Sequence, residues 1–391
     1  MFDACVQINM QQGFGGGEVY TAAFARALDH MGLDAPLFVH PRARAWPLLG
    51  TSGVRVEPLS DPAHLIERLR DRPPCWLVFH TLAPASVIGE LRSQGHLVTA
   101  FAHMPLYGGD PEPFRPFDRV LAVSRHVIAS LHAAGIHKVY PEPLYGTADV
   151  ARAGQRGGVL RAHSRYDWDR RKLRDRLLGA LEPLWEPFLP RRVFGRRLGL
   201  TLGVVSRLTP IKQFPQLFAC LSGILARDPS VWIDIFGSGG YASVRDLERA
   251  LLPIRTRVRF WGHQADVGSV YRNIDFLLAG LPEMEALGLN IIEAQACGTP
   301  VLAPDAPPFD ETVMDGVTGL RYRDPRSDGG ADFERVLQLV LDGGFRFDAA
   351  AAAGHLALFS EAAFFERTRA LAESLASFAA INGHSLISNR P

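Results

Sequence analysis

The stretch from Glu283 to Gly319 gathers the side chains with the clearest potential for chemistry. It places two carboxylates, Glu285 and Glu293, around a turn centred on Gly288. The residues after this glycine predict a helix, whose first turn offers free backbone N–H groups and a positive dipole end to an anion, most naturally a phosphate. Three interpretations of the carboxylates stay open: an acid/base pair for hydrolysis, holders of ribose and sugar hydroxyls, or a capping and solvated pair.

Arg207 and Lys212 lie in a second turn, within VVSRLTPIKQF, between an apolar strand and a helix. Two cations in one such turn could neutralise a diphosphate, because a guanidinium binds it bidentately and an ammonium acts as a point charge. The alternative is a pair of exposed surface charges.

The sequence GFGGGE at 13–18 follows the first apolar strand and opens a helix. Gly16 and Gly17 could contact a phosphate or a sugar, or they could serve only the conformation of the turn. His103 and His80 also follow apolar strands. A single histidine is more often structural, and the position of His103 at a strand end favours a site there more than at His80.

Metal and redox chemistry find little support in the sequence. The four cysteines are isolated and show no zinc or disulfide spacing, which favours reduced thiols in a cytosol. The triplet Asp167-Trp168-Asp169 could hold a divalent metal, but at an expected helix start the aspartates are interpreted as helix caps. We therefore expect neither a metal nor another cofactor.

The elements that position these residues alternate between strands and helices. In the first half we expect strands at 2–8, 36–39, 76–79, 97–101 and 119–123, with helices at 18–31, 63–70, 84–93 and 125–134. In the second half we expect strands at 198–205, 231–236, 257–260 and 275–279, with helices at 213–226, 243–252 and 266–272. Strands that are apolar throughout are typical of parallel sheets covered on both faces.

The predicted fold class is α/β, with two Rossmann-like doubly wound domains that face a central cleft. We expect an N-terminal domain at 1–150, a connection at 151–197 and a C-terminal domain at 198–360. Residues 361–391 would form a final helix, which could return to the N-terminal domain, and then a tail.

The 391 residues carry a net charge of +1, which gives no support to nucleic-acid binding by the whole chain. No signal peptide and no apolar run long enough to cross a bilayer are expected. The connection at 151–197 has 13 basic and five acidic side chains, a net charge of +8. It could dock on anionic lipid or recognise a lipid-linked or phosphorylated acceptor, or it could be a solvated insertion. We expect a cytoplasmic protein, with peripheral contact on the inner face of the cell membrane as a hypothesis.

Taken together, these motifs resemble those of the GT-B-fold retaining glycosyltransferases of family 4, also called glycosyl transferases group 1. The resemblance follows the chain in order through GGGEVYTAAFARAL, AHMP, VSRHV, GVVSRLTPIK, IDIFGSGG, VRFWGH, the two glutamates, EAQACGTPVLAP and DGVTGL. The last of these strings, from the glutamates onward, is the most specific.

The resemblance implies roles for individual residues. Arg207 and Lys212 match the diphosphate clamp, Glu293 the ribose holder and Glu285 the residue that faces the donor sugar. His103 matches a histidine near the reacting sugar. The remaining implied donor contacts are glycines and backbone groups: Gly16, Gly17, Gly262, His263, Leu287, Gly288 and Leu289. Ala286-Leu287 replaces the usual Gly-Phe pair, which puts the identity of the sugar in doubt.

The function implied is transfer of a hexosyl unit from a UDP- or GDP-linked sugar, with retention of configuration and without a metal. The acceptor would be a glycan or a lipid-linked molecule bound by the N-terminal domain, as in bacterial surface polysaccharide, lipopolysaccharide or glycolipid assembly. The alternatives are a nucleotide-sugar epimerase of the same fold and a non-catalytic nucleotide-sugar-binding subunit.

Overall fold

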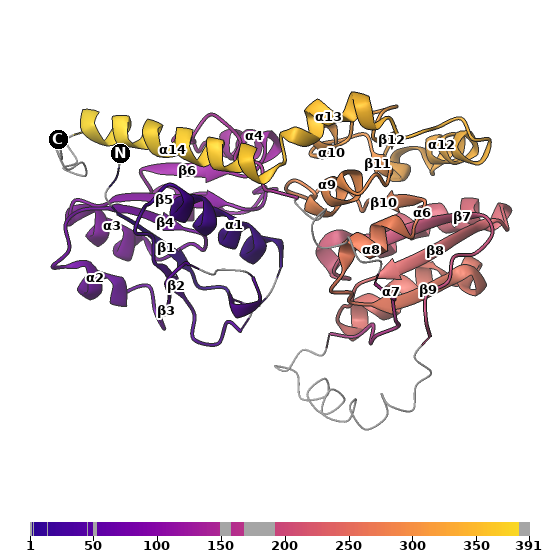
Figure 1. Cartoon of the computed structure of the whole chain (residues 1–391), viewed down its shortest axis with the longest axis horizontal. Coiled ribbons are helices and arrows are strands. Elements are labelled where there is room, and N and C mark those ends of the chain that lie inside the picture. The colour runs from indigo at the N-terminus through magenta and orange to yellow at the C-terminus, as the bar shows by residue number, and fades with distance from the viewer. Residues whose placement is uncertain are drawn as a thin grey trace, which may run out of the picture. The chain divides into compact units, whose positions relative to one another are not determined.

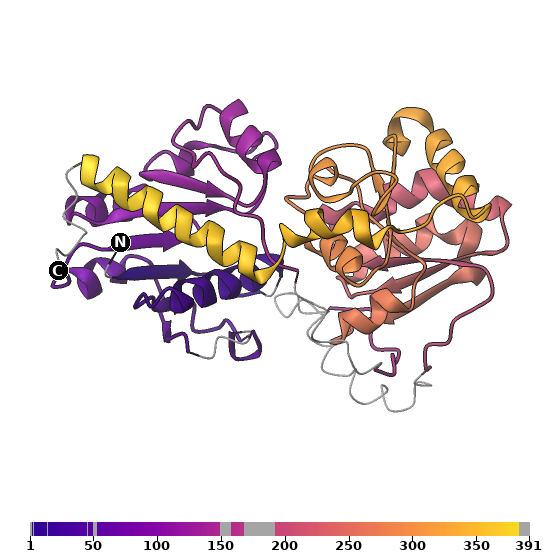
Figure 2. The same cartoon turned by 45° about the horizontal axis from the view of Figure 1, so that its top comes forward.

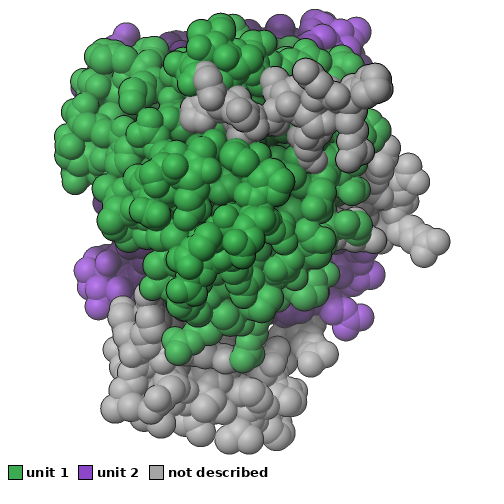
Figure 3. All heavy atoms as spheres, turned by 90° about the vertical axis from the view of Figure 1, so that its left-hand side faces the viewer, with its two compact units in different colours: residues 1–147, 357–391 green, residues 148–356 purple. Residues whose placement is uncertain are grey.

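The computed structural model describes residues 2, 4–13, 15–44, 46–49, 53–148, 158–167 and 192–382. The chain divides into two compact units (Figure 3), unit 1 with residues 1–147 and 357–391 and unit 2 with residues 148–356. Each unit contains one parallel six-stranded sheet with helices (Figure 1). The prediction of two Rossmann-like doubly wound domains is therefore confirmed. Within the described residues, no helix is both long and apolar enough to span a membrane.

The sheet of unit 1 has the strand order β3-β2-β1-β4-β5-β6. Its strands are β1 Cys5–Asn9, β2 Leu37–Val39, β3 Val56–Pro58, β4 Trp76–Phe79, β5 Leu97–Ala102 and β6 Arg119–Ala122. Its helices are α1 Gly16–His30, α2 His64–Leu69, α3 Ala85–Ser93, α4 Arg125–Ala133 and α14 Glu361–Ile381. Short 3₁₀ turns span Trp46–Leu48 and Glu112–Phe114. The chain order reverses between β1 and β4, where ligands bind in such folds.

Helix α14 belongs to unit 1, although it follows unit 2 in the sequence. It runs along the layered elements of unit 1 in both views (Figures 1 and 2) and packs on α1. The ring of Phe364 meets Tyr20 and Phe24 edge-on, with centroids 5.5 and 6.5 Å away. Arg367 donates to the backbone oxygen of Tyr145. The aromatic face of α1 is therefore buried by a helix from the far end of the chain.

The sheet of unit 2 has the order β12-β11-β10-β7-β8-β9. Its strands are β7 Leu200–Val205, β8 Val231–Phe236, β9 Val258–Gly262, β10 Phe276–Leu278, β11 Val301–Pro304 and β12 Gly319–Tyr322. Its longer helices are α6 Phe214–Arg227, α7 Tyr241–Ala250, α9 Leu289–Ala296, α12 Ala331–Leu341 and α13 Ala349–Ala357. Shorter helices are α8 Val267–Arg272, α10 Phe309–Thr312 and α11 Pro325–Asp328, with 3₁₀ turns at Pro210–Lys212 and Leu252–Arg257. Here the chain order reverses between β7 and β10.

Parts of the basic connection belong to unit 2. Leu160 is buried and Phe194 packs on the ring of Trp261, with centroids 5.1 Å apart. Arg165 and Arg196 form ion pairs with Glu248 and Asp275, so part of the positive charge is neutralised within unit 2. The helix-like run from 168 to 191 lies outside the described residues.

One buried ion pair joins two strands of unit 2. Asp234 in β8 has no exposed surface and accepts hydrogen bonds from Arg259 Nε and Nη2, both at 2.6 Å, and from Trp261 Nε1 at 2.9 Å. A buried carboxylate that loses its cation leaves an uncompensated charge in a medium of low polarity.

We predict that Arg259→Met lowers the free energy of unfolding of unit 2 by about 3 kcal/mol, because Asp234 then stays buried without its cation. The matched control is Arg245→Met, which removes an exposed partner of Asp246 and should cost less than about 1 kcal/mol. Urea unfolding followed by tryptophan fluorescence measures both. Equal losses in the two variants would contradict the role assigned to this pair.

Candidate functional site

The turn before α9 has the conformation that only glycine adopts readily. Gly288 caps the helix with φ +80°, and a Cβ atom there would lie 2.9 Å from Ile291 Cδ1. Among the described residues, no acceptor is bonded to the backbone N–H groups of Leu287, Gly288 and Leu289. These groups and the helix N-terminus form a position suited to an anion. The predicted turn and helix start are confirmed.

Lys212 and Glu285 meet directly, with Lys212 Nζ 2.5 Å from Glu285 Oε2. The contact joins the loop after β7 to the loop after β10, which are neighbouring strands. The two loops also touch at Gly280, where a Cβ atom would lie 2.7 Å from the backbone oxygen of Lys212. The sequence places these two residues in separate motifs, and the structure brings them together.

Asn290 makes a second connection between the same loops. Its Nδ2 donates to the backbone oxygen of Val205, the last residue of β7, at 3.0 Å. This bond attaches the first turn of α9 to the strand end that precedes Arg207, whose side chain is exposed. Sequence reasoning missed Asn290 because its partner Val205 lies 85 positions away in the sequence.

Glu293 lies one turn further into α9 and is partly buried. Tyr271 in α8 is fully buried and donates its hydroxyl to Glu293 Oε2 at 2.7 Å. Burial raises the pKa of Glu293 to about 7, while the bond from Tyr271 acts to lower it. Tyr271 was missed because a tyrosine on the apolar face of a helix looks like an ordinary core residue.

Gly262 and His263 lie at the end of the edge strand β9, with β8 between them and β7. Gly262 has φ +68°, and a Cβ atom there would come within 2.5 Å of the backbone oxygen of Ser164. His163 N donates to Trp261 O at 2.9 Å, so the 158–167 segment lies against this strand end. His263 is exposed beyond it.

The remaining candidates belong to unit 1. Helix α1 begins at Gly16, and Gly17 has helical backbone with no atom within 4 Å of the place where a Cβ would stand. Packing within the described residues therefore does not require glycine at position 17. The space beside this end of the helix is open. Phe14 lies outside the described residues.

His103 follows β5, and its Nε2 lies 3.4 Å from Nδ1 of His80. Burial lowers the pKa of His103 to about 4 and that of His80 well below its usual range, so both rings are neutral at pH 7. His103 can therefore take part in a hydrogen bond with a ligand but carries no positive charge.

Three or more histidine, cysteine, aspartate or glutamate side chains do not cluster in a metal-binding arrangement anywhere in the described part of the chain. Of the Asp167-Trp168-Asp169 triplet, only Asp167 is described, and its backbone N–H donates to Gly239 O. The other two residues lie outside the described ranges.

Comparison with known proteins identifies the part of unit 2 that carries Arg207, Lys212 and both glutamates. The sequence model of the family described as Glycosyl transferases group 1 matches residues 199–344. This matched stretch is called the group 1 region below. The group 1 region includes β7 to β12 and the helices between them.

Curated relatives match a similar share of the chain. A D-inositol 3-phosphate glycosyltransferase of Rhodococcus opacus is 34% identical over 158 residues, which cover 38% of this chain and 34% of the relative. A GDP-mannose-dependent monoacylated alpha-(1-6)-phosphatidylinositol monomannoside mannosyltransferase of Corynebacterium glutamicum is 30% identical over 160 residues, 38% of this chain and 40% of the relative. The chain thus spans about a third of the length of the curated relatives it matches.

Solved structures match both units. The Anabaena protein Alr3699/HepE, crystallised with UDP, superposes with a TM-score of 0.69 at 18% identity, over 96% of this chain and 100% of that one. Together with the two parallel sheets, this likeness confirms that the group 1 region is part of a GT-B fold.

The raised pKa of Glu293 gives a prediction for stability. The folded protein holds this proton more tightly than the unfolded chain, so ionising Glu293 costs stability as pH rises from about 4.5 to about 7, and the cost is then constant. Glu293→Gln should therefore stabilise unit 2 at pH 8 by about 1 to 3 kcal/mol and much less at pH 5.

Thermal unfolding at the two pH values measures the effect. Glu373→Gln changes an exposed carboxyl of α14 and is the matched control, with no expected difference between pH 5 and pH 8. A loss of stability in Glu293→Gln at pH 8 would show that the carboxylate is well compensated in the fold.

Proposed function

We propose that the protein is a retaining glycosyltransferase that moves a hexosyl unit from a nucleoside diphosphate sugar to a glycan or lipid-linked acceptor. The single observation that supports this most is the contact of Lys212 with Glu285, which lies two residues before the first of the unbonded N–H groups at the start of α9. A cation, a helix N-terminus and a carboxylate converge there at the strand reversal of unit 2. This combination suits a diphosphate joined to a polyol.

Departure of the diphosphate is the demanding part of such a transfer, because negative charge accumulates on the leaving group. Lys212, Arg207 and the amides of Leu287 to Leu289 would stabilise that charge, and stabilisation of this kind supplies much of the rate enhancement in many enzymes. Lys212 is held by Glu285 at 2.5 Å, so its ammonium is already oriented within the loop. The positively charged groups are all provided by unit 2.

The two glutamates take different roles in this proposal. Glu293 would accept hydrogen bonds from the ribose hydroxyls, with its Oε2 oriented by Tyr271. Glu285 would face the donor sugar while it holds Lys212. Gly262 and His263 would present backbone groups to the base. No acid/base step through the carboxylates is needed, because retention by front-face attack lets the departing phosphate accept the acceptor's proton.

Sugar choice and acceptor binding remain parts of the same proposal. Ala286 and Leu287 are buried just before α9. In this proposal they would limit the space beside the donor sugar. Unit 1 would bind the acceptor, and Gly16, Gly17 and His103 would be its contributions to ligand binding. Relatives named for inositol phosphate, for a phosphatidylinositol mannoside and for GDP-mannose favour a polyol or a glycolipid acceptor and either UDP or GDP as the nucleotide.

A thermal-shift panel with UDP-glucose, UDP-N-acetylglucosamine, UDP-galactose and GDP-mannose tests the donor class. One of these sugar nucleotides should raise the melting temperature more than its free sugar does, because binding to the folded state stabilises it. Release of the nucleoside diphosphate should then depend on an added acceptor. Conversion of the donor sugar without an acceptor would favour an epimerase instead.

We predict that Lys212→Ala and Arg207→Ala each lower the rate of transfer by about 100-fold or more, because each removes charge stabilisation from the leaving diphosphate. Arg249→Ala, which changes an exposed cation of α7, is the matched control and should keep the wild-type rate. Steady-state kinetics with the donor identified by the panel measure all three. Near-normal turnover in both site variants, with both folded by circular dichroism, would overturn the assignment.

A further prediction concerns whether the rate of transfer depends on a metal ion. Since protein cations and helix amides would neutralise the diphosphate, EDTA should leave the initial rate within about twofold of the untreated enzyme. Loss of activity that Mg²⁺ or Mn²⁺ restores would show that a metal ion shares this role.

A further inference from the structure

A chain of buried polar side chains crosses the sheet of unit 1 and ends at His103. Gln7 is in the middle of β1, His80 directly follows β4, and His103 follows β5. His80 Nε2 lies 3.4 Å from Gln7 Oε1, and His80 Nδ1 lies 3.4 Å from His103 Nε2. Gln7 has no exposed surface and His80 has 5%. Three neighbouring strands thus provide one continuous row of hydrogen bonds.

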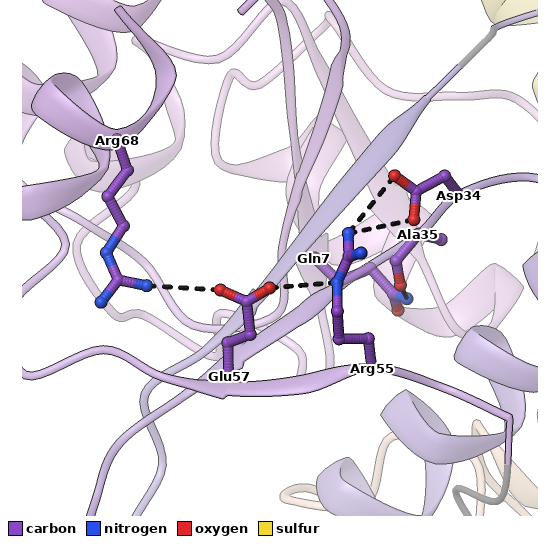
Figure 4. Close-up of polar contacts among 6 residues, drawn as sticks. All are labelled: Gln7, Asp34, Ala35, Arg55, Glu57 and Arg68. Carbon is purple, nitrogen blue, oxygen red and sulfur yellow. Dashed lines mark hydrogen bonds and ion pairs between the residues drawn. The ribbon is translucent and has the colours of Figure 1, made fainter.

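The direction of this row follows from its first member. Gln7 Nε2 donates to the backbone oxygen of Ala35 at 3.4 Å, and Figure 4 shows the two residues together. A flipped amide would place its oxygen against that carbonyl oxygen, two acceptors in contact. Gln7 Oε1 therefore faces His80, and because it can only accept, the proton of His80 must be on Nε2.

The remaining proton positions follow in order. A neutral His80 protonated on Nε2 has a lone pair on Nδ1, so it accepts from His103 Nε2–H. Neutral His103, protonated on Nε2, then has its own lone pair on Nδ1. Among the described residues, no donor is bonded to this nitrogen.

Aromatic rings hold both histidines in place. Phe101 stacks on His80 with an interplanar angle of 7° and on His103 with 22°, at centroid distances of 5.0 and 5.4 Å. Tyr20 meets His103 edge-on at 5.2 Å, and Phe24 meets His80 at 5.7 Å. The imidazoles are therefore restricted in rotation as well as in protonation.

We propose that Gln7 and His80 are positioning residues that fix His103 with its proton on Nε2, so that His103 Nδ1 is a hydrogen-bond acceptor for a substrate hydroxyl. His103 then recognises an O–H group of the sugar or the acceptor and does not donate to the diphosphate. The hydroxyl as ligand rests on the proposed function. The protonation pattern depends only on contacts within unit 1.

Two substitutions of His80 separate the hydrogen bond from packing. In His80→Asn, the side-chain oxygen stands near the place of Nδ1 and can still accept from His103. In His80→Phe, the ring still stacks on Phe101 but offers no acceptor, so His103 Nε2–H would be buried without a partner. Histidine-selective ¹⁵N NMR of the full chain, with His103→Gln used for assignment, measures which nitrogen carries the proton.

In the wild type at pH 7.5 we expect both His80 and His103 to be neutral, with Nε2 protonated and Nδ1 unprotonated. His80→Asn should keep this pattern at His103, and His80→Phe should lose it. A proton on Nδ1 of His103 in the wild type, a charged His103 ring, or the same His103 signals in His80→Phe as in the wild type would overturn the proposal.

Kinetics with the donor from the thermal-shift panel provide the functional readout. His80→Phe should lower kcat by about 10-fold or more, and His80→Asn should recover most of that loss, because only the acceptor atom differs in function. Equal kcat values in the two variants, at equal thermal stability, would show that His80 has only a packing role. If the wild type shows no transfer at all, the proposed function fails, while the NMR result still decides the state of His103.

Discussion

The strand reversal of unit 2, between β7 and β10, is the constraint on which the candidate site depends. At this point the loops after two adjacent parallel strands leave in different directions and open a space at the sheet edge. Lys212 with Glu285 and Asn290 with Val205 connect the two loops across that opening. The glycine conformation at 288 then starts α9 with its amides unbonded. Sheet topology thus determines where an anion can bind, and a few polar contacts hold the two loops together at that place.

Two carboxylates of unit 2, one fully buried and one partly buried, have different surroundings. Asp234 is compensated by a bidentate arginine and an indole N–H, so it serves the sheet. Among the described residues, Glu293 has one side-chain donor, the hydroxyl of Tyr271. Its pKa is raised to about 7 because that bond does not offset desolvation. A carboxylate that accepts few hydrogen bonds from the protein can accept further hydrogen bonds from a ligand. The contrast separates a structural carboxylate from a candidate functional one within the same sheet.

Much of the fold could be predicted because its signals are local. Apolar strands and helical periodicity located most elements. Gly32, just after helix α1, and Gly288, just before α9, both have the positive φ that favours glycine in a turn. The edge strand β3 was missed because Val56 and Glu57 are only partly buried and Pro58 follows them, so no apolar run marks it. The motif spacing indicated Arg207, Lys212 and the glutamates. It could not show that Lys212 pairs with Glu285, since that contact spans 73 positions.

The supporting residues were hidden for a related reason. Gln7 and Tyr271 lie in apolar stretches and have no distinguishing spacing, so their roles depend on neighbours that are distant in the sequence. His80 was named as a candidate, but its contact with Gln7 could not be predicted. Likewise, the positive connection was predicted as a unit, whereas Leu160 and Phe194 pack into the core of unit 2. The roles of such residues can be assigned from their neighbours in the folded structure, but not from residue type.

The return of α14 to unit 1 determines the order in which the chain can mature. Tyr20 and Phe24 are made early, but the helix that buries them is made only after all of unit 2. During synthesis the aromatic face of α1 therefore stays uncovered until α14 has been made, whereas all the elements of unit 2 are made before α14. Unit 1 is therefore completed after unit 2.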